Sequence, residues 1–353
     1  MKDFDDLYRD MNSVVNLYTS QFKRKKAAWG LHNSKLKQKG SIDMCRIYSY
    51  KTSDNIFQKK VKQPKEKSHG IILLIDNSYS MVSNIFSVVQ KATELAIFAV
   101  RNKIDMECYF FTSGRNKCAE KDKEGLNVDD LKLVNLYNRN MSETDIRNIF
   151  YNYYLFKYNR NMLDTNILRH LEHIWYMSGT PLLEAYMAMV ERCKLMSLRD
   201  IQHINLCVLT DGETNSPLYF GGDILKSFLD PFSQNIYNVD NSLKMNIENK
   251  QLELMNRILK DSNITTSHIH ITSEYSFYDK IIPDTILRDK FNIDSYVYID
   301  NNPLKFDNTL IIKSKYIKNI NLDTNDMQDY NHKIKINKQL TTSIIDALCQ
   351  YYL

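Results

Sequence analysis

The chain lacks the features that would place it in a membrane or export it. No apolar run approaches the ~18–20 residues that a helix needs to cross a bilayer. The first residues, Met1–Asp6, are acidic and are not followed by the apolar stretch of a secretory signal. The six cysteines are scattered and form no Cys-x-x-Cys pair. We therefore expect a cytoplasmic protein with reduced thiols, two of which, Cys108 and Cys207, fall in predicted buried strands.

Several catalytic motifs are also missing. The sequence contains no Gly-x-x-x-x-Gly-Lys-Ser/Thr loop for binding a nucleotide and no Gly-x-Ser-x-Gly nucleophile motif. A phosphotransferase of the Asp-x-Asp type needs a second aspartate two residues after the first, but Ser78 follows Asp76 at that spacing. We favour a protein without catalytic activity of its own. The alternative is a Mg²⁺-dependent hydrolase or peptidase that uses Asp76 or Asp211.

The composition is that of a soluble globular protein, with 43% hydrophobic and 25% charged residues. The net charge of +5 is unevenly placed, because residues 1–69 hold 16 Lys and Arg against 7 Asp and Glu. We expect three parts. A basic N-terminal arm spans 1–67, a central domain spans 68–320 with an insertion at 113–175, and a C-terminal segment with a closing helix spans 321–353.

The stretch Gly70–Met81 organises the central domain. Five apolar residues, Ile71–Ile75, predict a buried strand, and the polar run Asp76–Ser80 follows it directly. Apolar residues at helical spacing then predict a helix after the polar loop. Because ligands bind at the carboxyl ends of parallel strands in open α/β sheets, the polar loop is the first candidate site.

Two distant stretches match this one. Ser178–Pro181 opens a predicted helix, and Leu206–Thr210 predicts a second buried strand that leads into Asp211. Together with Asp-x-Ser-x-Ser at 76–80, they resemble the metal-ion-dependent adhesion site of von Willebrand factor A (vWA) domains. The resemblance implies an α/β fold with a doubly wound, mostly parallel sheet (a Rossmann-like vWA domain), here with a basic N-terminal extension and a helical insertion.

The same resemblance implies a metal site made of five residues. Ser78, Ser80 and Thr180 would ligate Mg²⁺ or Mn²⁺ directly, while Asp76 and Asp211 would act largely through bound water. Such oxygen donors suit Mg²⁺, which takes about six oxygen ligands at roughly 2.1 Å. An open position would accept an Asp or Glu from a protein partner. The alternative is that Ser78 and Ser80 only cap a helix and Asp211 only begins a turn.

The segments before the metal motif narrow the resemblance. Tyr48–Lys51, Asp54–Phe57 and Lys67–Gly70 resemble the vWA proteins of tailed bacteriophages, which in turn are similar to the vWA subunit of aerobic cobaltochelatase. This implies an adaptor in the host cytoplasm that works with a MoxR-class AAA+ ATPase in a cobaltochelatase-like or chaperone-like phage system. A structural component of the virion is a further alternative. Tyr79 departs from the pattern, because many members of the family have Gly there.

The N-terminal arm raises the question of nucleic acid. The run Lys59–Lys65 is of the kind that binds nucleic acid, but no aromatic residues interleave with it and no known nucleic-acid motif is present. We therefore interpret the run as a solvated linker or a partner-facing arm, and we expect neither nucleic acid nor a membrane as partner.

Periodicity predicts the remaining elements. His268 and His270 share one face of a predicted strand and are interpreted as polar surface residues. The expected helices are 1–22, Leu131–Val134, Thr144–Phe156, Ile167–Tyr176, the helix after Pro181, Met245–Leu259, Ile281–Phe291 and Thr341–Tyr352, and the further strands are Met106–Thr112, Ile264–Ile271, Ser295–Ile299 and Leu310–Ile312.

Overall fold

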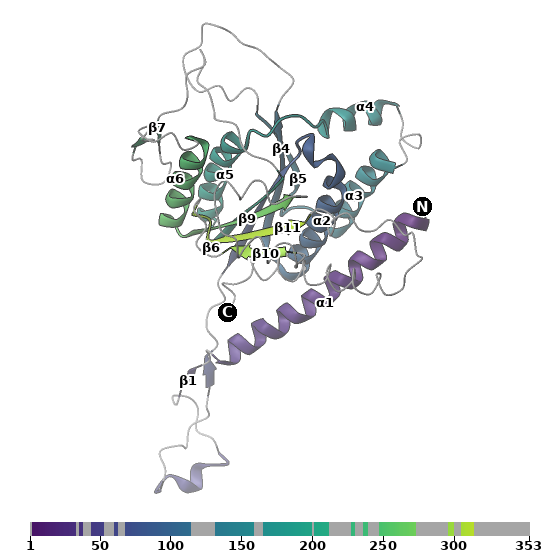
Figure 1. Cartoon of the computed structure of the whole chain (residues 1–353). Helices are drawn as coiled ribbons and strands as arrows, with labels where there is room; N and C mark the ends of the chain where they lie inside the picture. Colours follow the sequence, from purple (N-terminus) through teal and green to yellow (C-terminus); the bar gives the residue numbers. More distant parts are fainter. Residues whose placement is uncertain are drawn as a thin grey trace.

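The protein is built around a seven-stranded sheet (Figure 1). The computed structural model describes residues 2–32, 35–37, 44–52, 60–62, 68–113, 131–158, 165–199, 201–211, 227–229, 236–238, 247–272, 296–299 and 305–313. From one edge to the other, the strands of the sheet are β10 (Tyr296–Ile299), β11 (Asn308–Lys313), β9 (Ile264–Thr272), β6 (His203–Thr210), β3 (His69–Asp76), β4 (Asp105–Ser113) and β5 (Leu131–Tyr137).

The five inner strands of the sheet, from β11 to β4, run parallel. The two edge strands, β10 and β5, run antiparallel to their neighbours. The first strand in the sheet, β3, lies near its centre, between β6 and β4, so the chain winds outward from it in both directions. The predicted α/β architecture with a doubly wound, mostly parallel sheet is confirmed.

Helices cover both faces of the sheet. Because side chains alternate along a strand, Ile71, Leu73 and Ile75 of β3 join the core on one face, while Ile72 and Leu74 join the core on the other. The first face packs against α1 (Lys2–His32), α2 (Ile85–Asn102) and α3 (Glu143–Tyr158), and the second against α5 (Leu182–Ser197) and α6 (Ile247–Asp261). No helix in the described ranges is long and apolar enough to cross a membrane.

The N-terminal helix is part of this core. The sequence predicted a helix over 1–22, and the structure extends it to His32 as α1. Its apolar side is buried, and the ring of Phe22 lies 5.4 Å from that of Phe98 on α2. Arg101 of α2 donates to Asn12 and Asn16 of α1 at 2.7 Å. The first half of the predicted basic arm is thus folded against the sheet's helices.

The segment between β4 and α5 is only partly as predicted. The expected helix at Leu131–Val134 is wrong, because these residues belong to β5, which pairs with the free edge of β4. Four residues are too few for periodicity to separate strand from helix. The expected helices at Thr144–Phe156 and Ile167–Tyr176 are confirmed as α3 and α4 (Thr165–Ile174). This segment therefore adds an edge strand and a core helix.

The predictions for the C-terminal half of the chain have mixed outcomes. The helix at Met245–Leu259 and the strands β9, β10 and β11 are confirmed, while Ile281–Phe291 and Thr341–Tyr352 lie outside the described residues. The interpretation of His268 and His270 as surface residues is wrong, since both are at most 2% exposed. His268 stacks on Phe306 at 4.7 Å, and burial lowers its pKa to about 3.

Among the described residues, two short ribbons lie outside the main sheet. One pairs β7 (Ser227–Leu229) with β8 (Ile236–Asn238), and the other pairs β1 (Lys35–Lys37) with β2 (Lys60–Lys62). Two single 3-10 turns are η1 (Ile47–Ser49) and η2 (Ser80–Ser83). The turn η2 follows β3 directly and carries part of the candidate site.

Candidate metal centre

The sheet brings the two predicted carboxylates to the same edge. β3 ends at Asp76 and the neighbouring parallel strand β6 ends at Thr210, with Ile75 paired to Leu209. Asp211 is the residue that follows. Because the strands are parallel and in register, two stretches that lie 134 residues apart along the chain meet at their carboxyl ends, as demonstrated by the hydrogen bond of Thr210 to Asp76.

Asp76 is completely buried and is held on both oxygens. Its Oδ1 accepts the backbone N–H of Ser78 at 2.9 Å, and its Oδ2 accepts the Thr210 hydroxyl at 2.6 Å. Burial raises the pKa of the Asp76 carboxyl to about 7, and the charge of Asp211 adds to the rise, while the hydrogen bonds from Thr210 and Ser78 oppose it. The two hydrogen bonds therefore fix the orientation of the Asp76 carboxylate, but they compensate its negative charge poorly.

A chain of hydroxyls continues toward Asp211. The Ser78 and Ser80 oxygens lie 2.9 Å apart, and the Ser80 hydroxyl donates to Asp211 Oδ1 at 2.7 Å. Since Ser80 has one hydroxyl proton and gives it to Asp211, Ser78 is the donor in the bond between the two serines. Partial burial also raises the pKa of Asp211. Three predicted site residues thus form one connected chain.

The loop that carries Thr180 lies against this chain. Ser178 forms a parallel bridge with Ser78, and the Tyr79 N–H donates to the Ser178 carbonyl at 2.9 Å. Gly179 packs so closely that a Cβ there would lie 2.7 Å from Ser113 Oγ. In the described contacts the Thr180 hydroxyl makes no hydrogen bond to the other four residues. The structure therefore brings its loop, but no side-chain contact, to the site.

The donor set fits a hard divalent cation. Among the residues that the structure describes, no cationic side chain is one of the groups that shift the pKa of Asp76 or Asp211. Among the residues with described side chains, no three His, Cys, Asp or Glu gather as a metal cluster, so this site depends on hydroxyls together with two carboxylates. Hydroxyl and carboxylate oxygens are ligands that Mg²⁺ accepts, and a divalent cation would supply the positive charge that the buried carboxylate lacks.

Sequence reasoning missed two supports of this site. Thr210 anchors Asp76, and Thr112 accepts the N–H of Ser178 at 2.9 Å. Both are hydroxyl residues near the carboxyl ends of strands that flank β3. The signal was available, since a threonine directly before Asp211 on a neighbouring parallel strand falls level with Asp76.

Exposed apolar side chains lie beside the site. Tyr79, between the two site serines, is 74% exposed, and Val82 follows in η2 with 42% exposed. The half-exposed Tyr158, at the end of α3, packs its ring 4.9 Å from Phe86. The neighbouring Lys157 donates to the Val82 carbonyl at 3.2 Å, which ties α3 to η2. We call Tyr79, Val82 and Tyr158 the apolar rim.

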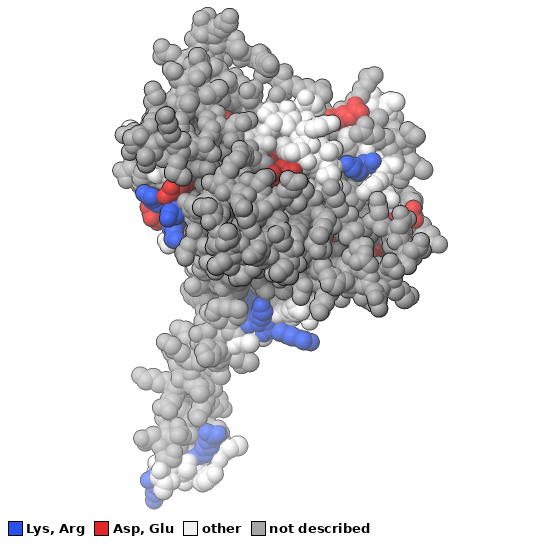
Figure 2. Space-filling model, in the orientation of Figure 1, with Lys and Arg blue, Asp and Glu red and all other residues white. Residues whose placement is uncertain are grey.

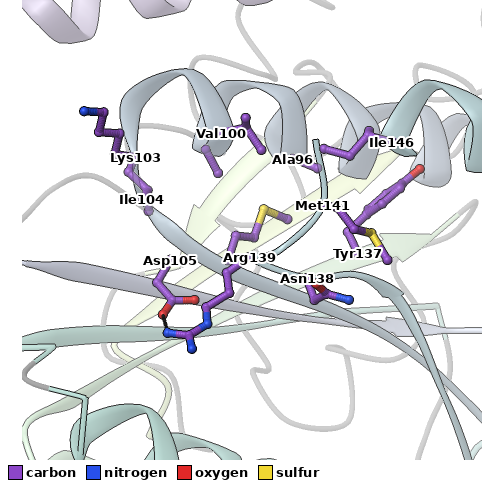
Figure 3. A pocket seen from close by; sticks show the side chains of 12 residues that line it. Ala96, Val100, Lys103, Ile104, Asp105, Tyr137, Asn138, Arg139, Met141 and Ile146 are labelled. Carbon is purple, nitrogen blue, oxygen red and sulfur yellow. Dashed lines mark ion pairs between the residues drawn. The ribbon is translucent and has the colours of Figure 1, made fainter. Parts of the chain in front are cut away.

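A pocket of about 350 Å³ lies at the opposite end of the parallel strands from the candidate metal centre (Figure 3). It is lined by apolar residues of α2 and α3 and by Asp105, the first residue of β4. Figure 3 shows Arg139 reaching toward Asp105, with which it pairs at 3.6 Å. This edge holds the amino ends of the parallel strands, so the pocket is separate from the candidate metal centre.

Comparisons with known proteins give structural likeness alone. No family model and no curated protein sequence matches the chain. The chain is similar to the pilus adhesin SpaC of Lactobacillus rhamnosus GG, with 12% identity, 78% of this chain and 30% of that chain covered and a TM-score of 0.38. It is similar to proximal thread matrix protein 1 of the mussel byssus, with 14% identity, 66% and 50% covered and a TM-score of 0.32. The SpRpn10 VWA domain shows 14% identity, 61% and 80% coverage and a TM-score of 0.30. The chain thus spans under a third of SpaC and half of the mussel protein.

Proposed function

We propose that the protein is a metal-dependent protein-binding module of the vWA type. Asp76, Ser78, Ser80, Thr180 and Asp211 would hold Mg²⁺ or Mn²⁺ at the carboxyl edge of the sheet. The observation that carries the proposal is the hydroxyl chain from Ser78 through Ser80 to Asp211, set beside a buried Asp76 that pairs with no cation in the described part of the chain. The bound cation would supply an electrophilic position for an oxygen ligand from outside.

The chain's own residues would set up that position. Thr210 and the Ser78 N–H fix both oxygens of Asp76, so the carboxylate cannot turn away from the site. Ser78 is almost fully buried while Ser80 is exposed, so the serine chain runs from the interior to the surface. A ligand that approaches from solvent therefore meets Ser80 and the half-buried Asp211 first.

A carboxylate is the ligand best matched to this geometry. A charge-assisted bond to a partly dehydrated cation is stronger than an exposed ion pair. The apolar rim adds exposed tyrosine and valine surface next to the site, and aromatic residues are enriched at the centre of protein interfaces. We infer a partner that presents an Asp or Glu flanked by apolar side chains.

The finer assignment depends on the sequence resemblance alone. The segments from Tyr48 to Met81 support an adaptor for a MoxR-class AAA+ ATPase in a cobaltochelatase-like or chaperone-like phage system. In that role the ATPase turns over ATP, and this chain selects the client. A Mg²⁺-dependent hydrolase is less supported, because Ser78, and not a second carboxylate, stands two residues after Asp76.

Calorimetry tests the metal site. Titration with Mn²⁺ or Mg²⁺ should show weak binding that Asp76→Ala abolishes and that the double variant Ser78→Ala/Ser80→Ala reduces. Ser83→Ala is the matched control, because Ser83 is exposed in the same 3-10 turn and should leave binding unchanged. Equal metal binding by wild type and Asp76→Ala would rule out this site.

A pull-down from the native host tests the partner. Wild type and Ser83→Ala should retain a protein that EDTA releases, and Ser78→Ala/Ser80→Ala should not retain it. An AAA+ ATPase in the released fraction would support the finer assignment. Equal retention by all three chains in the presence of EDTA would overturn the metal-bridged mechanism.

A further inference from the structure

A paired ribbon and its tip project from the body of the protein. β1 and β2 pair antiparallel, and between them the structure describes residues 44–52, which include η1. We call β1, residues 44–52 and β2 the ribbon arm. Figure 1 shows it beyond the end of α1, with its tip far from the sheet.

The register of the ribbon collects positive charge on one face. Lys35 pairs with Lys62 and Lys37 with Lys60, while Leu36 pairs with Val61 between them. Residues two apart in a strand share a face, so the register places all four lysine positions on the same face of the ribbon. Like charges directly opposite each other destabilise an antiparallel pair. A polyanion laid along this face would relieve that repulsion.

The charge of the surrounding sequence has the same sign. Residues 23–67 contain fourteen Lys and Arg and three Asp and Glu. The basic cluster at 23–26 lies on the part of α1 that leads into β1, and Lys23 and Arg24 there are exposed. In Figure 2 the coloured atoms of the arm are blue or white. The described residues of the ribbon arm therefore include Lys and Arg but no Asp or Glu.

The tip of the arm exposes aromatic and apolar side chains. Tyr48 is 83% exposed and Tyr50 is 60% exposed, and Met44 and Ile47 beside them are also exposed. The Lys51 ammonium lies 5.7 Å from the centre of the Tyr50 ring. Proteins that bind single-stranded nucleic acid stack its bases on exposed aromatic rings and contact its phosphates with cationic side chains.

We propose that the ribbon arm binds single-stranded nucleic acid, with the four ribbon lysines on phosphates and Tyr48 and Tyr50 stacked on bases. The sequence argued against nucleic acid because no aromatic residue interleaves with Lys59–Lys65. The fold changes this argument. It pairs the two lysine-containing strands β1 and β2, so Tyr48 and Tyr50, which lie between them in the sequence, belong to the segment that connects the pair. Stacking requires unpaired bases, which favours a single strand over a duplex.

An acidic protein is the competing partner for the same surface. A folded acidic protein would match the charge, but it would offer its carboxylates in an irregular pattern. A nucleic-acid strand presents a regular row of phosphates together with flat bases, and so it matches both the lysine row and the exposed rings. This function is separate from the metal centre, because no ribbon-arm residue belongs to the predicted ligand set.

Fluorescence anisotropy tests the lysines. The probes are labelled oligo-dT and oligo-rU of about 20 nucleotides, a length above the ~4–16 nucleotides that one single-strand-binding fold covers, titrated with the full chain in EDTA at several salt concentrations. Each phosphate contact contributes about −0.7 to the slope of log K against log salt. Changing all four ribbon lysines to Gln should lower the magnitude of that slope by about 3. Changing the same four to Arg keeps the charge and should keep the slope.

The same assay tests the tyrosines. Tyr48→Ala/Tyr50→Ala should weaken binding by about tenfold or more with an unchanged salt slope, since stacking is not screened by salt as phosphate contacts are. Tyr48→Phe/Tyr50→Phe keeps the rings and should bind like wild type. Leu198→Ala is the control, because Leu198 is an exposed apolar residue at the end of α5, outside both the arm and the apolar rim.

Three results would overturn the proposal. The first is no binding of either probe by wild type at low salt, and the second is equal binding by wild type and the four-Gln variant. The third is capture of an acidic protein through the arm without affinity for either oligonucleotide, which would make the arm a protein contact. Asp76→Ala should bind the probes like wild type, so failure of the metal site and failure of the arm are told apart.

Discussion

Two buried carboxylates on neighbouring strands have opposite surroundings. Glu107 of β4 is 4% exposed and accepts hydrogen bonds from Arg192 at 2.7 Å and from the Tyr109 hydroxyl at 2.8 Å. Arg199 approaches the same carboxylate at 3.3 Å. Asp76 of β3, equally buried, accepts hydrogen bonds from the Thr210 hydroxyl and the Ser78 backbone N–H, and no cation pairs with it among the described residues.

The electrostatics follow this difference. Although burial alone would raise it, the pKa of Glu107 is lowered, because Arg192, Tyr109 and Arg199 together outweigh the desolvation. The pKa of Asp76 is raised to about 7 because desolvation outweighs its neutral donors. Glu107 thus carries its own cations and ties α5 to the sheet. Asp76 is buried without a cation among the described residues, and a carboxyl with a pKa shifted by desolvation is a candidate for a functional site.

The largest expected effect on stability is that of removing the Glu107 carboxylate from its ion pairs. Removal of one partner from a buried ion pair costs about 3–5 kcal/mol, and less here because Arg192 and Arg199 are about a third exposed. Glu107→Ala should therefore lower the free energy of unfolding by about 2–3 kcal/mol. In EDTA, Asp76→Asn should change it by less than about 1 kcal/mol, because the amide removes an uncompensated buried charge.

Urea denaturation of the two variants and wild type measures this difference. Glu143→Ala is the control for a partly exposed ion pair with Arg101, and it should cost less than about 1 kcal/mol. Equal losses for Glu107→Ala and Asp76→Asn would show that both carboxylates are structural, which would remove the electrostatic argument for the metal centre.

The sequence predicted much of the fold because local pattern and strand topology agree there. The apolar runs at Ile71–Ile75 and Leu206–Thr210 specify two buried strands, and parallel neighbours must end at one edge. That is enough to expect Asp76 and Asp211 close together. The connected hydroxyls of Ser78 and Ser80 follow from their positions in the loop after β3.

Other features depend on contacts that a local pattern does not contain. The four residues Leu131–Val134 become a strand because the edge of β4 is open to them. Glu107 meets Arg192 and Arg199 across 85 and 92 residues of chain. The lysines of β1 and β2 meet only when the ribbon pairs, so composition showed their charge but not their shared face.

A pH titration sharpens the comparison with a smaller effect. The folded pKa of Asp76, about 7, lies above its ordinary value of 3.8, so the folded state binds a proton that the unfolded chain has released. This contribution to stability is fully present below about pH 4 and is lost as the pH rises through about 7. Glu107 has a lowered pKa, so its contribution is present above its ordinary 4.5 and changes only at more acidic pH.

Of the two carboxyl groups, Asp76 should therefore dominate the change in the free energy of unfolding between about pH 5.5 and 7.5. Metal-free wild type should gain up to about 1–2 kcal/mol as the pH falls across this window, since one pKa unit corresponds to about 1.4 kcal/mol. Asp76→Asn should lose most of that slope, and Mn²⁺ should flatten it in wild type because the cation favours the charged form. Urea midpoints in EDTA at three pH values give the measurement. Identical slopes for wild type and Asp76→Asn would contradict the raised pKa.

The smallest effect on stability is expected at the surface beside Asp76. Tyr79 is 74% exposed, so Tyr79→Ala should change the free energy of unfolding by less than about 0.5 kcal/mol. Its Mn²⁺ affinity should stay at the wild-type value, because the described hydrogen bonds of Tyr79 to the site loop are made by its backbone N–H and carbonyl, which the substitution keeps.

Partner binding should separate Tyr79 from an ordinary exposed residue. Leu198, at the end of α5, is also 74% exposed and is the matched control. If the apolar rim contacts the partner, Tyr79→Ala should weaken EDTA-sensitive retention of that partner by about fivefold or more, the effect of losing about 1 kcal/mol at an interface. Leu198→Ala should retain it like wild type. Undiminished retention by Tyr79→Ala would limit recognition to the carboxylate and the metal, and the rim would then have no part in choosing the partner.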